Sequence, residues 1–185
     1  MMVGMPESTE LDELNTARDL IKLKPKMCRI YPVLVIKGTE LAREYSAGEY
    51  VPLTVEQAVE RCKEITYLFR KKKIDVIRIG LQNTDEITYK EEDGSQVLAG
   101  PFHPAFRQLV EGSMWYDSLA EKIKGINTKA KKVEIEVNPE DTNNVIGHKK
   151  ENLKKLQDLY EVEIVVTPNE ELKQGNFEIK VLENY

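Results

Sequence analysis

The sequence predicts an α/β fold with parallel strands in residues 1–124, followed by a small α+β domain in residues 131–185. In the first part, apolar strands alternate with amphipathic helices, and the order strand, helix, strand is typical of a βαβ unit. Residues 29–36 (RIYPVLVI) are almost continuously apolar, as in a strand buried on both faces of a parallel sheet. After residue 131 the strands alternate apolar with charged residues, which indicates a sheet with one face in solvent.

The first βαβ unit is predicted at the N-terminus. Residues 1–4 have the pattern of the end of a strand. The helix after Thr9 is predicted from an apolar stripe at helical spacing, made of Leu11, Leu14, Ala17, Leu20 and Ile21. Residues 29–36 form the next strand, although Pro32 requires a bulge or a strand end because it has no N–H to donate.

A second βαβ unit follows. Residues 39–45 predict a short helix, and a longer helix begins after Thr54, with Gln57 in the capping-box position. Its C-terminal end, residues 70–73, is basic and suits the negative end of the helix dipole. This run is either a solvated helix end or a patch for a partner. Residues 74–81 predict the strand that completes the unit.

The rest of the chain is predicted from turn residues and from apolar periodicity. Residues 91–94 (EEDG) predict a turn, residues 105–110 and 113–122 two helices, and residues 125–131 (GINTKAK) the linker between the domains. In the second domain we expect strands at 133–137, 162–166 and 177–181, with a helix at 149–160.

Composition excludes several classes of protein. The chain has 185 residues, of which 41% are hydrophobic and 32% charged, as in a soluble globular protein, with a net charge of -5. No apolar run is long enough to cross a membrane and the N-terminus does not resemble a signal peptide, so a cytoplasmic location is expected. Cys28 and Cys62 are too few for a disulfide framework and are expected to be reduced packing residues.

The second domain resembles the KH domain of RNA-binding proteins in the spacing of its apolar residues around Gly147. That family has a Gly-x-x-Gly loop between two helices, where the backbone approaches the phosphates of RNA. Here the loop reads Gly147-His148-Lys149-Lys150, so that a lysine replaces the second glycine.

Local charge favours RNA as a partner of this domain. Residues 122–155 contain nine lysines against five acids within a chain of net charge -5. The expected nucleic-acid-binding residues are Gly147, His148, Lys149, Lys150, Lys154 and Lys155. The replaced glycine leaves a second interpretation open, in which the domain has lost RNA binding and serves as a docking platform. His148 either stacks on a base or lies in solvent.

Residues 1–112 resemble the radical S-adenosylmethionine (SAM) enzymes of the Elongator catalytic subunit group. The resemblance rests on four sequence segments: MVGMPEST (2–9), RIYPVLVIKGTEL (29–41), IRIGLQ (77–82) and GPFHPAF (100–106). The Gly-x-Pro turn in the first segment is shared with oxygen-independent coproporphyrinogen oxidases. The resemblance implies the end of a TIM-like radical SAM barrel. In such a barrel the carboxyl ends of the strands line the active site, which places Gly4, Pro6, Lys37, Gly38 and Thr39 near SAM or substrate. Lys37 either meets a carboxylate or phosphate there, or caps a strand end.

The resemblance also implies SAM and a four-iron, four-sulfur cluster in the intact protein. The cluster-binding Cys-x-x-x-Cys-x-x-Cys motif is absent from this sequence, so the chain alone is expected to carry neither cofactor and to be inactive. We therefore expect a truncated protein or a split gene, without a metal site.

Several alternatives stay open at this stage. The chain is the C-terminal portion of a radical SAM enzyme that modifies tRNA, or a non-catalytic RNA-binding or interaction module, or part of a coproporphyrinogen oxidase-like enzyme. Arg78 either pairs with an acid such as Asp75 or faces a cavity, and His103 is either a turn residue or a catalytic base. An incomplete barrel also has an open strand edge, through which the chain could associate with itself.

Overall fold

The computed structural model describes residues 1–89, 94–126 and 130–184 of the chain. Residues 91–93 of the predicted turn and residues 127–129 of the predicted linker therefore lie outside the described residues. The chain divides into two compact units, Met1–Val110 and Glu111–Tyr185. This division falls earlier than the linker that we expected at 125–131. No helix among the described residues is long and apolar enough to span a membrane.

The first unit is built on a parallel sheet of three strands. Strands β1 (Met2–Val3), β2 (Met27–Pro32) and β4 (Asp75–Ile79) lie in the order β1-β2-β4, and both pairs are parallel. Met2 pairs with Tyr31, and Ile30 pairs with Ile79, so that β2 has a parallel neighbour on each side. The two predicted βαβ units are confirmed.

Helices α1 (Glu10–Lys22) and α3 (Val55–Lys71) connect these strands. Each begins with a capping box, in which a threonine oxygen accepts from the N–H of the third helical residue and that residue's side chain accepts from the threonine N–H. The predicted cap at Thr54 and Gln57 is therefore confirmed. The two helices contact one another and bury one face of the sheet, where Ile30, Val76 and Phe69 are inaccessible or nearly so.

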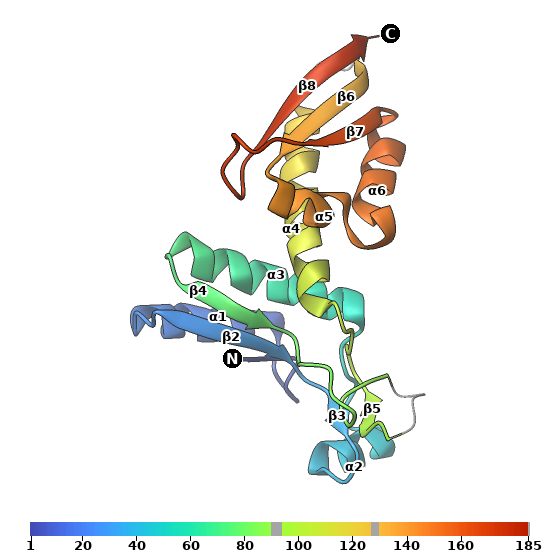
Figure 1. Cartoon of the computed structure of the whole chain (residues 1–185). Helices are drawn as coiled ribbons and strands as arrows, with labels where there is room; N and C mark the ends of the chain where they lie inside the picture. The colour runs from blue at the N-terminus through green and yellow to red at the C-terminus, as the bar shows by residue number, and fades with distance from the viewer. Residues whose placement is uncertain (90–93, 127–129, 185) are drawn as a thin grey trace. The chain divides into compact units, whose positions relative to one another are not determined.

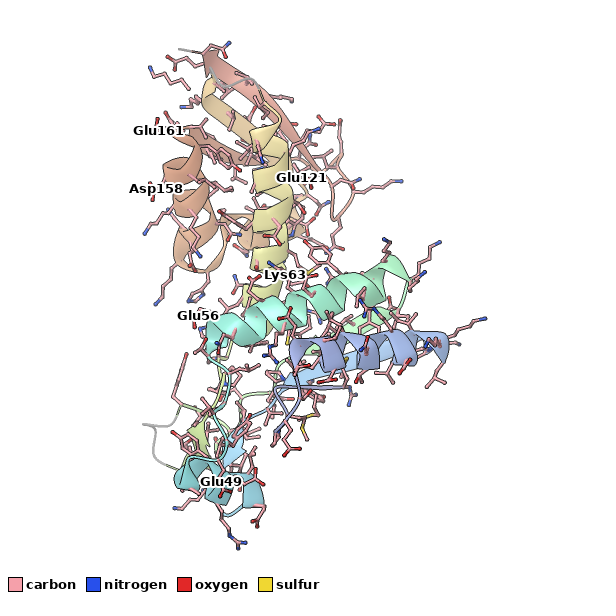
Figure 2. All side chains as sticks on the ribbon, turned by 180° about the vertical axis from the view of Figure 1, so that it is seen from behind. Glu49, Glu56, Lys63, Glu121, Asp158 and Glu161 are labelled. Carbon is pink, nitrogen blue, oxygen red and sulfur yellow. The ribbon has the colours of Figure 1, made fainter. Side chains whose placement is uncertain are left out.

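The opposite face of this sheet is exposed in the described part of the first unit. Figure 1 shows the sheet from the side of its strands, and Figure 2, turned by 180°, shows it from the side of α1 and α3. Met2, Met27 and Ile77 are 45%, 55% and 43% exposed on the strands. The exposed residues Arg29 and Arg78 are register partners on β2 and β4. Parallel sheets are normally covered on both faces, so this half-covered sheet lacks a layer.

The predicted strand at 29–36 is divided at Pro32. Strand β2 ends there, and β3 (Val35–Ile36) pairs antiparallel with β5 (Val97–Ala99) in a separate two-stranded sheet. The strand end predicted at Pro32 is confirmed, because proline cannot donate to a ladder. The residues after it were expected in the same parallel sheet, and this expectation was wrong. The short helix predicted at 39–45 is confirmed as α2 (Glu40–Ala47), which is capped by Thr39 and packs on β3.

Helix α4 (Phe106–Lys124) is a single helix, whereas the sequence predicted two helices separated near Gly112. Gly112 is buried, and a Cβ there would lie 3.6 Å from the Asn144 oxygen and 3.7 Å from Asn152 Nδ2. These are ordinary van der Waals distances, so a side chain as small as that of alanine would fit, and the glycine does not break the helix. Leu119 and Ile123 of α4 belong to the core of the second unit, which explains why this unit begins before the predicted linker.

The second unit contains a sheet with the order β7-β6-β8, made of β6 (Ala130–Val137), β7 (Glu163–Pro168) and β8 (Phe177–Asn184). Strand β6 is parallel to β7 and antiparallel to β8. Buried and partly exposed residues alternate along β6 as predicted, with Val133, Ile135 and Val137 in the core. Between β6 and β7 lie η1 (Pro139–Asp141), α5 (Thr142–Ile146), η2 (His148–Lys150) and α6 (Glu151–Tyr160).

Candidate functional site

The turn after β1 is held by hydrogen bonds from distant parts of the first unit. Gly4 N–H donates to Glu13 Oε1 of α1 at 2.6 Å, and Tyr50 Oη donates to the Gly4 carbonyl at 2.6 Å. Gly4 has a φ of +83°, and a Cβ there would lie 2.9 Å from Leu53 Cδ1. Only glycine fits both the backbone conformation and the space, so the start of the Gly-Met-Pro turn is fixed in one arrangement.

A buried ion pair supports the same turn. Glu13 is 3% exposed, and its Oε1 lies 3.2 Å from Arg61 Nη1 on α3. Its other oxygen, Oε2, is buried and has no hydrogen-bond partner among the described residues. A buried carboxylate is costly without partners, so the Gly4 N–H and the Arg61 guanidinium stabilise Glu13 in place.

Glu13 also affects two neighbouring groups that titrate. Burial, and then the negative charge of Glu13, raise the pKa of the Tyr50 hydroxyl. The same two causes raise the pKa of the Cys62 thiol to about 12. Both groups are therefore neutral at pH 7, and Tyr50 keeps the proton that it donates to the Gly4 carbonyl.

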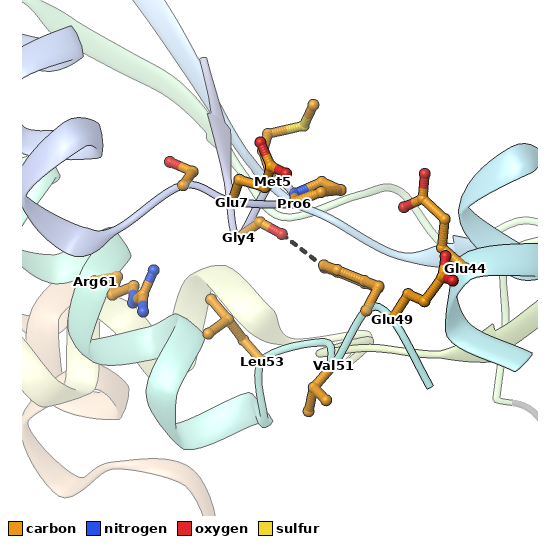
Figure 3. Close-up of a pocket in the computed structure, with 11 residues that line it drawn as sticks. Gly4, Met5, Pro6, Glu7, Glu44, Glu49, Val51, Leu53 and Arg61 are labelled. Atoms are coloured by element: carbon orange, nitrogen blue, oxygen red, sulfur yellow. Dashed lines mark hydrogen bonds between the residues drawn. The ribbon is translucent and has the colours of Figure 1, made fainter. Parts of the chain in front are cut away.

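A cavity of about 630 Å³ opens beside this turn, as Figure 3 shows. Its volume lies in the range of small-molecule sites. Arg61 contributes a positive charge and Glu7, Glu44 and Glu49 contribute negative charges. The full lining is Gly4, Met5, Pro6, Glu7, Ser8, Glu44, Glu49, Tyr50, Val51, Leu53 and Arg61. The lining combines backbone polar groups with both signs of charge, which suits a zwitterionic ligand that has hydroxyl groups.

The expected cofactor-binding residues are divided by the structure into two groups. Gly4 and Pro6 line the cavity, whereas Lys37, Gly38 and Thr39 form the turn between β3 and α2 and are not among its lining residues. Thr39 Oγ1 accepts from Ala42 N–H at 3.2 Å, which caps α2. Lys37 N–H donates to the Gln96 carbonyl at 2.8 Å, and its side chain is exposed.

Two other residues singled out in the sequence have local contacts. The Arg78 side chain is exposed and donates to Gln82 Oε1 at 3.0 Å, a neutral amide and neither of the two alternatives considered, an acid such as Asp75 or a cavity. His103 Nδ1 accepts from Ala105 N–H at 3.1 Å immediately before α4. This contact gives His103 the role of a turn residue at the start of the helix.

The loop expected to bind RNA lies between α5 and α6. Gly147 has φ +78° and ψ 165°, a region open in practice only to glycine. Lys149 and Lys150 have φ values of +50° and +63°. Lys150, at the position of the second glycine of the KH pattern, therefore adopts the left-handed conformation that glycine adopts without strain.

The lysines of the loop and of α6 differ in their contacts. Lys149, Lys150 and Lys154 are exposed, and Lys155 Nζ lies 2.6 Å from Glu151 Oε1 in an exposed pair one helical turn apart. Exposed pairs of this kind are weak, so Lys155 can exchange Glu151 for a phosphate. His148 is half-buried, which differs from the solvated side chain that we considered.

Asn152 holds this loop in place, a role that no pattern in the sequence indicated. Its buried Nδ2 donates to the carbonyls of Gly112 at 2.8 Å, Asn144 at 3.1 Å and Val145 at 3.3 Å. These contacts satisfy carbonyls at the end of α5 and tie the loop to α4. A Cβ on Gly147 would lie 2.8 Å from Asn152 Cγ, so the glycine and the asparagine fit only together.

Comparison with known proteins bears on the first unit. Residues 25–116 match the Radical_SAM C-terminal domain family. The matched segment is slightly less than half of the 185 residues and contains β2, α3 and β4. The resemblance to radical SAM proteins predicted from the strings at 29–41, 77–82 and 100–106 is therefore confirmed for this segment.

Two curated relatives are similar to part of the chain. The tRNA uridine(34) acetyltransferase of Methanocaldococcus jannaschii is 40% identical over 63 residues, which are 32% of this chain and 12% of that protein. The enzyme of the same name from Methanocaldococcus infernus is 42% identical over 66 residues, again 32% of this chain and 12% of that protein. The chain thus covers only about 12% of the length of each of these relatives.

The radical SAM family implies SAM and an iron-sulfur cluster in the intact protein, but the residues described here do not fit a cluster. Cluster ligands are thiolates, and the chain has only Cys28 and Cys62. Burial raises the pKa of both thiols, and that of Cys62 reaches about 12. No group of three or more His, Cys, Asp or Glu side chains in the described part of the chain is placed to hold a metal ion.

We expect Glu13→Ala to destabilise the first unit by about 2–4 kcal/mol, because it leaves the buried Gly4 N–H and Arg61 without their acceptor. Cys62 reports this change, since it is inaccessible in the folded unit. In a Cys28→Ala background at pH 8, Cys62 should react with a thiol reagent roughly thirtyfold faster or more when Glu13 is replaced. Glu10→Ala, on the exposed side of the same helix, is the control. Equal rates in both variants would contradict the role of Glu13.

Opposite effects are expected at the two ends of the loop at 147–150. Gly147→Ala should lower the stability of the second unit by at least about 2 kcal/mol, because alanine is strained at this φ and meets Asn152. Lys150→Gly should raise stability by up to about 1 kcal/mol, because it removes left-handed strain. The single tryptophan, Trp115, packs on the core of this unit, so urea unfolding followed by its fluorescence measures both changes. A loss of stability in Lys150→Gly would show that the lysine side chain supports the loop.

Proposed function

We propose that this chain is the C-terminal portion of an iron-sulfur radical SAM enzyme that modifies tRNA, with a KH-like RNA-binding module at residues 131–185. The uncovered face of the parallel sheet β1-β2-β4 carries the proposal, because a parallel sheet of a folded protein is covered on both faces. In a barrel this face points inward, where side chains of further strands would cover Met2, Met27 and Ile77. The match of residues 25–116 to the Radical_SAM C-terminal domain family supports a radical SAM barrel as the source of those further strands.

The cavity beside Gly4 suits the SAM end of such an enzyme. It lies after the carboxyl end of β1, the end at which barrel enzymes of parallel strands form their active sites. Gly4 allows close backbone approach, Arg61 offers a partner for a carboxylate, and the glutamates of the lining offer acceptors for ammonium and hydroxyl groups. The cluster would be bound by residues outside this chain and would supply the electron that cleaves SAM.

The relatives favour tRNA as the substrate over a porphyrin precursor, since the two enzymes of known name are tRNA uridine(34) acetyltransferases. The loop Gly147-His148-Lys149-Lys150 supports the same substrate class. Its exposed lysines come just before α6, whose first turns add Lys154 and Lys155, whereas Asp158 and Glu161 lie toward the other end of that helix (Figure 2). Phosphate contacts are therefore expected at the beginning of α6.

The enzymatic proposal is tested on the longer protein to which this chain would belong. We expect a Cys-x-x-x-Cys-x-x-Cys motif within about 200 residues of coding sequence upstream of Met1, the size of the missing barrel. Anaerobic reconstitution of that protein should give iron binding and SAM cleavage, and the 185-residue chain alone should give neither. Cys28→Ala in the longer protein should retain its iron, because Cys28 is a packing residue. A longer protein that binds no iron or does not cleave SAM would refute the proposal.

The RNA-binding module is tested separately on the 185-residue chain. The double substitution Lys149→Glu and Lys150→Glu should abolish the shift of a tRNA transcript in a gel, because it reverses two charges where the loop is expected to meet phosphates. Arg18→Glu and Lys173→Glu change the net charge by the same amount and in the same direction at exposed positions outside the loop, and this double variant serves as the control. Unchanged binding by the Lys149 and Lys150 variant would reject this surface.

A further inference from the structure

The first unit carries a second cluster of positive charge, at the amino ends of its parallel strands. We call it the amino-end lysine surface, and it consists of Lys22, Lys24, Lys26, Arg70, Lys71, Lys72 and Lys73. These residues come from the two loops that precede β2 and β4 and from the helix ends that lead into those loops. Strands β2 and β4 are adjacent, since Met27 pairs with Asp75, and Asp75 N–H donates to the Lys26 carbonyl at 3.1 Å. The fold therefore places residues about fifty positions apart in sequence side by side.

Most of these charges are not neutralised within the protein. The side chains of Lys24, Lys26, Lys71, Lys72 and Lys73 are exposed, and none of the five forms a salt bridge in the described residues. The two segments that contain these cations, residues 19–26 and 70–75, have two acids. Asp19 pairs with Lys22 at 2.7 Å, and the other acid is Asp75. Seven cations against two acids, in a chain of net charge -5, form a strong local excess. Repulsion among them is unfavourable unless an anion binds.

Helix dipoles explain only part of this cluster. A cation in the last turn of a helix is stabilising, and one or two cations for each of α1 and α3 would provide this benefit. Lys24 and Lys73 instead follow the helices with φ values of +52° and +58°. A non-glycine residue in this left-handed conformation is strained, which offsets the benefit from the dipole. Glycine would end both helices at lower cost, so the lysines are poorly explained by the stability of the helices.

The chemistry of the surface fits a phosphate backbone. Lysine ammonium groups act as point charges that bind phosphates without a fixed geometry. Lys26 immediately precedes β2 and Lys73 precedes β4 by two residues, and these neighbouring strands are about 4.8 Å apart, so that the cations can follow a line of phosphates. Strand β2 has six residues, so this surface lies roughly 20 Å from the carboxyl end of the sheet, where the cavity lies. That distance corresponds to about six base-pair steps of a nucleic acid.

We propose that the amino-end lysine surface binds the phosphate backbone of the RNA substrate at a distance from the cavity, and so positions the RNA without reading its sequence. This inference rests on the proposed tRNA substrate and adds a contact surface in the first unit, independent of the loop at 147–150.

The test measures the affinity of the 185-residue chain for a fluorescent tRNA transcript at several salt concentrations. In the surface variant, Lys26, Lys71 and Lys72 are replaced by glutamine. These three side chains are exposed and have ordinary φ values, so the fold should be unchanged. The control variant removes the same charge from three exposed cations outside both surfaces, by Arg18→Gln, Arg43→Gln and Lys173→Gln. Thermal unfolding of both variants should match that of the unchanged chain.

We expect the surface variant to bind tRNA about tenfold or more weakly near 0.15 M salt, and the slope of log K against log salt to decrease by about 2–3. The control variant should bind within about twofold of the unchanged chain. Equal binding by the surface and control variants would overturn the inference. If the Lys149 and Lys150 variant loses tRNA while the surface variant keeps it, the inference fails and the proposed function stands; the reverse supports the surface and rejects the loop.

A second probe separates RNA from an acidic protein partner. Poly-L-glutamate is measured with the same three proteins under the same conditions. Weaker tRNA binding by the surface variant, with little change for poly-L-glutamate, supports an RNA surface. A larger effect on poly-L-glutamate than on tRNA would assign the surface to an acidic protein and overturn the inference.

Discussion

The parallel pairing of β1, β2 and β4 is the constraint on which the first unit depends. Parallel strands require long crossover connections, and here α1 and α3 supply them while burying one face of the sheet. The same connections bring the carboxyl ends of the strands to one edge and the helix-to-strand loops to the other. The cavity beside Gly4 and the amino-end lysine surface are thus consequences of one topology. The uncovered second face follows too, since both helices lie on the same side.

Local patterns predicted the elements of the fold well where one kind of signal decided them. Apolar spacing located α1 and α3, the threonine caps located their beginnings, and alternation located β6. Predictions failed near glycine or proline residues whose surroundings are set by contacts with distant parts of the chain. Two helices were predicted on either side of Gly112, whereas α4 continues through it and the Gly112 carbonyl accepts from Asn152 Nδ2, and the residues after Pro32 form a different sheet. Their partners lie far along the chain, so a local pattern could not reveal them.

The candidate site shows the same limit. The Gly-Met-Pro turn was found because its residue types are characteristic, and the structure places it on a cavity. Glu13, Tyr50 and Arg61 were missed, because each lies on an ordinary helix or loop and gains its role only by meeting Gly4 or its neighbours. One signal was available in the sequence: Glu13 lies one turn before Ala17, on the apolar stripe of α1, where a charged residue needs a buried partner.

Both units contain lysines in the left-handed backbone conformation. Lys24 and Lys73 end helices of the first unit, and Lys149 and Lys150 form the loop of the second. At such positions glycine lowers the strain of the folded backbone but offers a phosphate only its N–H group, whereas lysine adds a positive charge at the cost of strain. Replacing glycine with lysine at such a position is favourable if the lysine binds a phosphate, because the free energy of that contact offsets the backbone strain. Without a bound phosphate only the strain remains. On this argument the replaced glycine at Lys150 is compatible with RNA binding, since the backbone keeps the shape that the glycine would provide and gains a cation.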